Sequence, residues 1–515
     1  MRRREFVKSA GLASLAIPLS GCGLPARRPL KRPNILFIMA DDHASQAVGC
    51  YGGRLNRTPG IDRIAREGVR FDNCFCTNGI CAPSRAVILT GKHSHINGVR
   101  DNSVAIDGSQ TTFPKLLQAA GYETALLGKW HLQSDPTGFD YWNILPGQGD
   151  YYNPDLIEMG VKKKVPGYVT DILTDIAVDF LEARRRTEYK PFLLMLQHKA
   201  PHRNWQPAAR HMALYDTAEF PEPPTLFDDY ATRSRAAFEQ EMTISEHMTL
   251  DSDLKLGPPP ERLDQAQREA WEKAFGPKRE SFKKANFSGQ ALVRWKYRRY
   301  LQDYLGCIAA VDESVARVLD VLDRTGLAEN TLVVYTSDQG FFLGEHGWFD
   351  KRFMYEEALR MPLVMRFPGR VRPGSVNGDM VSNLDFAPTF LDVAGLGKPA
   401  PMQGRSFLPL LLGKRVAGWP ETVYYHYYEF PAVHMAKRHY GIRTKRYKLI
   451  HFYHDIDAWE LYDLEKDPRE LQNVYGDPAY AAIRRDLRRE LARLQAFYRD
   501  SEASARRLIE TDIGK

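Results

Sequence analysis

The sequence predicts a doubly wound α/β fold with a smaller α+β subdomain at its C-terminal end. Three apolar runs of strand length, residues 34–40, 191–196 and 331–336, are typical of parallel strands buried on both faces of a sheet. Segments with helical periodicity separate these runs, and such alternation indicates a doubly wound sheet. Polar residues follow each run, and ligands of these folds bind at the carboxyl edge of the sheet.

The helices expected between the strands are residues 58–68, 169–184 and 300–322. The first begins with a capping-type residue and stops at a glycine, and Gly326 follows the last of them. Residues 205–290 differ from the rest, because they are rich in proline and charge and show little periodicity. We interpret them as a long surface insertion that carries short helices.

The sequence pattern changes after about residue 415. There, short strands rich in aromatic residues are expected at 422–428 and 447–452, followed by a charged helix. We therefore divide the chain into a main domain at 34–414, which contains the insertion, and a C-terminal subdomain at 415–515.

Composition is that of a soluble globular protein, with 43% hydrophobic and 26% charged residues in a chain of 515. The formal net charge is +7, part of which lies in the extreme N-terminus. No basic stripe with interleaved aromatic residues is present, so the sequence argues against nucleic-acid binding. A modest positive balance suits an anionic substrate.

Residues 1–21 have the pattern of an export signal. A motif at residues 3–8 resembles a twin-arginine signal, and the apolar run after it is shorter than the roughly 20 residues needed to span a bilayer. Residues 19–22 resemble a bacterial lipobox, which predicts a lipid on Cys22 and a tether at 22–33; the alternative is a cleaved signal with an incidental cysteine. We expect export from a bacterial cytoplasm to the periplasm or outer surface, with membrane contact only through that lipid.

Acidic residues stand at two of the strand ends. Asp41 and Asp42 follow the first strand, and Asp338 follows the third. Three carboxylates at one sheet edge repel each other unless a cation compensates them, and oxygen ligands suit Ca²⁺ or Mg²⁺. A lone aspartate at a strand end is more often a turn or a cap, but three together favour a metal site.

The segment Cys81-Ala82-Pro83-Ser84-Arg85 matches the C-x-P-S-R sequence of formylglycine-type enzymes. Further segments that match the same family are residues 34–42, 81–91, 128–131, 337–340, 461–464 and 467–468. On these motifs the chain resembles type I sulfatases from about residue 33 to residue 474. The resemblance implies an alkaline-phosphatase-like fold, a mixed sheet flanked by helices, and the hydrolysis of sulfate esters. It also implies that a formylglycine-generating enzyme acts on Cys81.

The same resemblance assigns the site residues. It implies Ca²⁺ bound by Asp41, Asp42, Cys81, Asp338 and Gln339, where the commoner pattern has Asn in place of Gln339. It implies Lys129 and Lys351 for sulfate binding, His131 for assisting the nucleophile and His198 for protonating the leaving oxygen. If Pro83 opens a helix, Arg85 lies on the face of Cys81. Because Lys129 and His131 alternate, one extended segment could direct both toward the site.

An altered cysteine suits this chemistry. A thiolate that attacked sulfur would form an adduct with no easy exit, whereas an aldehyde hydrate has two hydroxyls on one carbon. One hydroxyl can attack sulfur, and the other can expel sulfate and restore the aldehyde. A structural thiol is the ordinary role of a buried cysteine.

The expected substrate contacts are Gln148, Asp150, His346, His434 and His439, from a Gly-rich loop and His-rich segments. The amino-acid sequence of residues 344–357 is most similar to that of bacterial sulfatases that remove 6-O-sulfate from N-acetylglucosamine in glycosaminoglycans or mucins. The alternatives are a sulfatase for another polysaccharide, a phosphonate or phosphate-ester hydrolase of the same superfamily, and an inactive surface glycan-binding protein.

Overall fold

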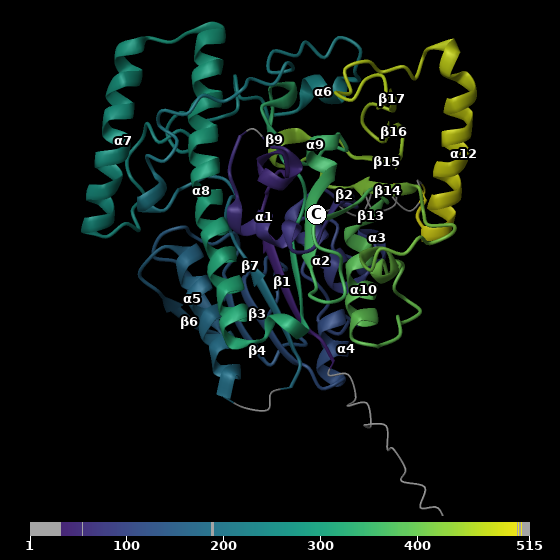
Figure 1. Ribbon diagram of the computed structural model, residues 1–515. Helices are drawn as coiled ribbons and strands as arrows, with labels where there is room; N and C mark the ends of the chain where they lie inside the picture. The colour runs from purple at the N-terminus through teal and green to yellow at the C-terminus, as the bar shows by residue number, and fades with distance from the viewer. Residues whose placement is uncertain (1–31, 54, 187–189, 502, 504–505, 507–515) are drawn as a thin grey trace, which may run out of the picture. The chain divides into compact units, whose positions relative to one another are not determined.

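The computed structural model describes residues 32–53, 55–186, 190–501, 503 and 506, which belong to one compact unit (Figure 1). The expected signal segment and Cys22 lie outside these residues. In the part of the chain that is described, no helix has the length and apolar character needed to cross a bilayer.

A mixed sheet of eleven strands forms the centre of the fold, as predicted. Five neighbouring strands are parallel, in the order β8 (Thr331–Ser337), β1 (Asn34–Ala40), β7 (Phe192–Gln197), β3 (Glu123–Lys129) and β4 (Tyr141–Leu145). Beyond β8, the strand β11 (Arg360–Arg366) is antiparallel and is followed by β2 (Val69–Phe75), β12 (Ser375–Asn377) and β13 (Val381–Ser382). Beyond β4 lie β5 (Asp155–Glu158) and β6 (Val161–Lys164).

Helices cover both faces of this sheet. The side chains of β1 alternate, so that Ile35, Phe37 and Met39 enter one core and the intervening residues enter the other. The first core contains residues of α2 (Cys81–Thr90), α4 (Phe113–Ala119) and α10 (Phe386–Val393). The second contains residues of α1 (Pro59–Arg66), α5 (Val169–Glu182) and α8 (Gly289–Thr325). The ribbon shows these two groups on opposite sides of β1, β7 and β3 (Figure 1).

The region 205–290 differs from the surface insertion that we expected. It contains α7 (Gln265–Ala285), a helix of 21 residues that begins with an Asp264–Gln267 capping box. Trp205 and Trp271 of this region are buried in the core under α8. The expectation of short surface helices is therefore wrong here, because scattered aromatic residues anchor the region without a regular apolar period.

The C-terminal subdomain is a four-stranded antiparallel sheet of β14 (Thr422–Tyr427), β15 (His439–Thr444), β16 (Tyr447–Phe452) and β17 (Ala458–Asp463). Leucines of α12 (Ala481–Tyr498) pack on this sheet at a spacing of three to four residues. Just after α12, the Asp500 carboxylate accepts hydrogen bonds from Tyr424 (2.8 Å) and His426 Nδ1 (2.7 Å). These bonds hold the end of the helix against β14.

The remaining elements are short. Among the α-helices and strands they are α3 (Ser94–Asn97), α6 (Arg235–Glu239), α9 (Glu356–Leu359), α11 (Leu408–Leu411), β9 (Phe342–Leu343) and β10 (Phe349–Asp350).

The register of the long strands positions the site. Ala40 is paired with Ser337, and Gln197 is paired with both Met39 and Gly128. The residues that follow β1, β7, β3 and β8 therefore meet at one edge of the sheet.

Candidate active site

Asp41, Asp42 and Asp338 meet at this edge, as the sequence predicts. Their carboxylates offer oxygens that all lie within 4.8 Å of one another, and all three residues are fully buried. The backbone N–H of Asp42 donates to Asp338 Oδ1 at 3.2 Å. Burial, together with repulsion from the Asp41 charge, raises the pKa of Asp42 to about 6 and that of Asp338 to about 7.

Each of these carboxylates has a cationic partner. The ion pairs are Lys129 with Asp41, Lys351 with Asp42 and Arg85 with Asp338. Lys351 Nζ lies 2.7 Å from both oxygens of Asp42, and Arg85 donates to Asp338 Oδ2 from Nε (3.1 Å) and Nη2 (2.9 Å). Burial opposes the charge on Asp41, but Lys129 and the neighbouring cations hold the pKa of Asp41 well below its usual range. The arrangement is a buried cluster of alternating charges.

Cys81 is the first residue of α2, and its side chain is directed at this cluster. Its Sγ lies 3.3 Å from Asp41 Oδ1, and the residue is 1% exposed. Burial and the Asp41 charge raise the pKa of the Cys81 thiol. Asn383 Nδ2 donates to Ser84 Oγ at 2.9 Å, and Ser84 in turn donates to the carbonyl of Asp338, which fastens the first turn of α2.

His131 reaches the cluster, but not from an extended segment. β3 ends at Lys129, and His131 has a left-handed backbone with φ of 57°. Burial and the nearby charges of Lys129 and Arg85 lower the pKa of His131 to about 2. Its Nδ1 is buried without a hydrogen-bond partner among the described residues. The argument from alternation is therefore wrong, although both side chains lie at the site.

His198 points away from the cluster, so its predicted position at the site is wrong. Its Nε2 lies 3.2 Å from Ser314 Oγ on α8, and burial lowers its pKa to about 4. The reason is that successive side chains along a strand point to opposite faces of the sheet. Gln197 accepts a hydrogen bond from Arg85 at 2.8 Å on the site side, and the next side chain along the chain faces the other core.

His202, which we did not predict, occupies the site instead. Its Nε2 lies 3.7 Å from Asp42 Oδ2, and the ring joins Asp41 and Cys81 in a second group of close potential ligands. His202 Nδ1 lies 2.7 Å from the carbonyl oxygen of Arg203. When Nδ1 donates a hydrogen bond to that oxygen, the other ring nitrogen, Nε2, faces the site. Burial and Lys129 lower the pKa of His202. A sequence signal existed, because Pro201 favours a turn, and in this turn the His202 N–H donates to the Lys199 carbonyl at 3.0 Å.

Two of the expected substrate residues lie beside the cluster. The carbonyl of Gln148 accepts from Lys199 Nζ at 3.1 Å, and burial and Lys129 lower the pKa of Lys199 to about 8. His434 Nε2 lies 3.3 Å from Asp350 Oδ2, directly before Lys351. Asp150, in contrast, has a half-exposed side chain that is paired with Arg262 at 3.2 Å.

The other two, His346 and His439, are packing residues, and their prediction as substrate contacts is wrong. His346 lies between Phe342, Trp348 and Tyr355, with Nδ1 2.9 Å from Asp228 Oδ2. His439 packs among Tyr425, Phe353 and Phe452, and both of its ring nitrogens contact backbone groups, of Lys437 and Met354. Both rings are enclosed, so neither reaches a substrate.

The donor set fits a hard divalent cation. Gln339 Oε1 is buried beside Asp42 and has no hydrogen-bond partner among the described residues, whereas Nε2 donates to Asp42. The amide oxygen and three carboxylates provide only oxygen ligands, the type that Ca²⁺ prefers. A divalent charge would also relieve the repulsion that raises the pKa values of Asp42 and Asp338.

The carboxyl edge of this α/β sheet combines buried carboxylates, lysines, histidines and a cysteine at the start of a helix. Such a site indicates a hydrolase of anionic esters. The family model described as Sulfatase matches residues 33–396, and that described as N-sulphoglucosamine sulphohydrolase, C-terminal, matches residues 344–497. The chain belongs to the sulfatase family, and it is a sulfuric ester hydrolase.

Known relatives agree with this assignment. The chain is 50% identical over 513 residues to an N-acetylglucosamine-6-O-sulfatase of Bacteroides thetaiotaomicron, covering 96% of this chain and 92% of that protein. A human N-acetylglucosamine-6-sulfatase is 28% identical, covering 82% and 72% of the two chains. A solved structure of a protein in complex with its substrate, D-glucosamine-2-N,6-O-disulfate, has a TM-score of 0.90 and 51% identity, covering 92% of this chain and 99% of the other.

Proposed function

We propose that this sulfatase removes 6-O-sulfate from N-acetylglucosamine units of glycosaminoglycans or mucin glycans. The observation that carries the proposal is the 50% identity, over nearly the full length of both chains, to a protein named for that activity. The match to a structure bound to a 6-O-sulfated glucosamine supports it further. Gln148 and His434, which lie beside the cluster, are the proposed sugar contacts.

We propose Ca²⁺ as the resident metal, held by Asp41, Asp42, Asp338 and Gln339. When bound, it would supply positive charge for the sulfate oxygens and acidify a hydroxyl on the neighbouring nucleophile. With the carboxylates compensated by the metal, Lys129 and Lys351 would direct their charge toward the sulfate of the substrate.

We propose that Cys81 becomes formylglycine through a formylglycine-generating enzyme, and that it then contributes to the metal site. When formed, the hydrated aldehyde would offer one hydroxyl to attack sulfur and displace the sugar oxygen, and a second to expel sulfate and restore the aldehyde. The net reaction consumes one water and yields the free sugar hydroxyl and sulfate. Residues 1–21 and Cys22 support a proposed location in the periplasm or on the outer surface, as an exported lipoprotein.

The test of the substrate proposal is positional selectivity. We expect the highest kcat/KM on N-acetylglucosamine 6-sulfate, compared with the 3-O-sulfated and N-sulfated glucosamines and with the 6-phosphate. A higher value for the N-sulfated sugar would assign a different bond. A higher value for the phosphate ester would favour the phosphate-ester alternative.

We propose His202 as the acid that protonates the leaving oxygen, in place of His198. A sugar alkoxide is very basic, so its protonation in the transition state is worth roughly 10²–10⁴-fold, whereas a nitrophenolate needs little help. The negative charge of a bound sulfate favours the protonated imidazole. His202→Ala should therefore reduce kcat/KM on the sugar sulfate by about 10²-fold or more, and far less on nitrophenyl sulfate.

His198→Ala is the matched control, because it removes the same ring four residues earlier and from the opposite face of the sheet. It is expected to lower the Tm and to leave the ratio of the two kcat/KM values unchanged. If His202→Ala reduced both substrates equally, the acid would be His131 instead.

A further inference from the structure

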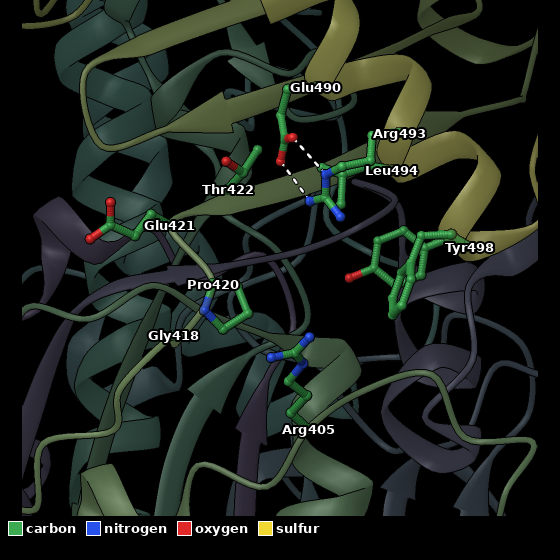
Figure 2. A pocket seen from close by; sticks show the side chains of 10 residues that line it. Arg405, Gly418, Pro420, Glu421, Thr422, Glu490, Arg493, Leu494 and Tyr498 are labelled. Atoms are coloured by element: carbon green, nitrogen blue, oxygen red, sulfur yellow. Dashed lines mark hydrogen bonds and ion pairs between the residues drawn. The ribbon is translucent and has the colours of Figure 1, made fainter.

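A pocket of about 270 Å³ lies between the start of β14 and the last turns of α12 (Figure 2). Its lining includes Arg405, Pro420, Thr422, Arg493, Phe497 and Tyr498. None of the catalytic residues lines it. It lies near the far end of the helix that begins with Cys81, because the backbone of Gln403 bonds Gly91 just after that helix. Ten helical residues span about 15 Å, so the pocket is separate from the catalytic centre.

The four charged residues that line the pocket, two arginines and two glutamates, differ in whether they form ion pairs. Arg493 is neutralised by Glu490 through bonds of 2.7 and 2.8 Å, and Glu421 pairs with Lys445 at 2.6 Å. Within the described chain, the guanidinium of Arg405 makes no hydrogen bond or ion pair; only its backbone N–H bonds Asp385. Figure 2 shows this guanidinium directed into the pocket, between Pro420 and Tyr498. Arg405 is exposed, and the charge of the Asp385 carboxylate attracts it without a direct ion pair, so the guanidinium can still pair with an anionic group.

The rest of the lining suits a sugar ring. Phe497, which is 56% exposed, lines the pocket, and Pro420 and Leu494 add further apolar surface. Aromatic faces with a few placed polar groups are typical of small-molecule sites. Arg405 and Tyr498 also line a smaller adjoining hollow that reaches His93, which is 2% exposed and whose Nε2 has no hydrogen-bond partner among the described residues.

We propose that this pocket is a second saccharide-binding site, which takes a sulfated or carboxylated sugar unit of the polymeric substrate. Arg405 would pair with the anionic group and Phe497 would pack on the ring. The inference rests on the proposed action on sulfated glycans. Its consequence is that a glycan chain is retained by the enzyme independently of the unit in the catalytic centre.

The experiment measures the Kd of a size-defined, sulfated glucosamine–uronate oligosaccharide by calorimetry, with kcat/KM on N-acetylglucosamine 6-sulfate measured in parallel. Arg405→Gln should weaken oligosaccharide binding about tenfold, corresponding to one charge-assisted hydrogen bond. The matched control is Arg415→Gln, which removes an equal charge from an exposed residue that does not line the pocket. It should change the Kd less than about twofold. Both variants should hydrolyse the monosaccharide like the wild type.

Phe497→Ala provides a second test of oligosaccharide binding. Its control is Phe238→Ala, because Phe238 is similarly exposed (55%) but lies on α6. Only the first should weaken binding. Equal losses in Arg405→Gln and Arg415→Gln would indicate general electrostatic attraction and overturn the proposal, as would an oligosaccharide that does not bind the wild type. Absent hydrolysis of the monosaccharide would instead contradict the proposed function, and the binding result would still decide this site.

Discussion

Replacing Cys81 with alanine is expected to lower kcat/KM for sulfate esters by on the order of 10⁴-fold or more, because it removes the proposed nucleophile. In active wild-type protein from a host that contains the converting enzyme, peptide mass spectrometry should find sulfur replaced by oxygen and two hydrogens removed at Cys81. The position of this thiol at the start of α2, 3.3 Å from Asp41, supports the expectation.

Cys74→Ala is the matched control. Cys74 is fully buried in β2 within the core and lies outside the charged cluster, so its loss should affect stability and leave the modification at Cys81 intact. Fully active enzyme in which Cys81 remains an unmodified thiol would contradict the proposal. Inactive protein from a host that lacks the converting enzyme would agree with it, provided that co-expression of that enzyme restores activity.

Asp338→Asn is expected to weaken calcium binding by more than about 100-fold and to abolish turnover together with it. Calcium at ~100 times its Kd should stabilise the wild type by about 2.7 kcal/mol, and this gain should disappear in the variant. Without metal, the variant should be at least as stable as the wild type above pH 7, because the raised pKa of Asp338 means that burial and repulsion from Asp41 outweigh the attraction of Arg85 for its charge. Calorimetry and thermal unfolding with and without calcium measure both effects.

Asp312→Asn separates metal binding from the general cost of altering a buried aspartate. The Asp312 carboxylate is buried and accepts hydrogen bonds from the backbone N–H groups of Gly60 (3.0 Å) and Ile61 (2.8 Å) at the start of α1. Its substitution should lower the Tm and preserve the calcium-dependent gain. A normal calcium response in Asp338→Asn would remove Asp338 from the proposed metal ligands.

Much of the fold follows from local pattern. The apolar runs at residues 34–40 and 331–336 become β1 and β8 within one residue, because a strand buried on both faces needs continuous apolar side chains. The start of α8 at Gly289 was not predictable in the same way, since the residues of its first turns are exposed or only partly buried. Tertiary packing beside α7, rather than amphipathic period, extends that helix.

The sequence by itself predicted the class of this protein, a sulfuric ester hydrolase. The segment around Cys81 and the acidic strand ends at Asp41, Asp42 and Asp338 are local signals, and parallel strands bring them to one edge. Only the tertiary structure decided which histidines lie beside the carboxylate cluster. His198 follows its strand directly and faces the opposite core, whereas the turn after Pro201 brings His202 to within 3.7 Å of Asp42. The direction of a side chain after a strand end depends on the path of the following loop, and that path is set by packing between segments distant in the sequence.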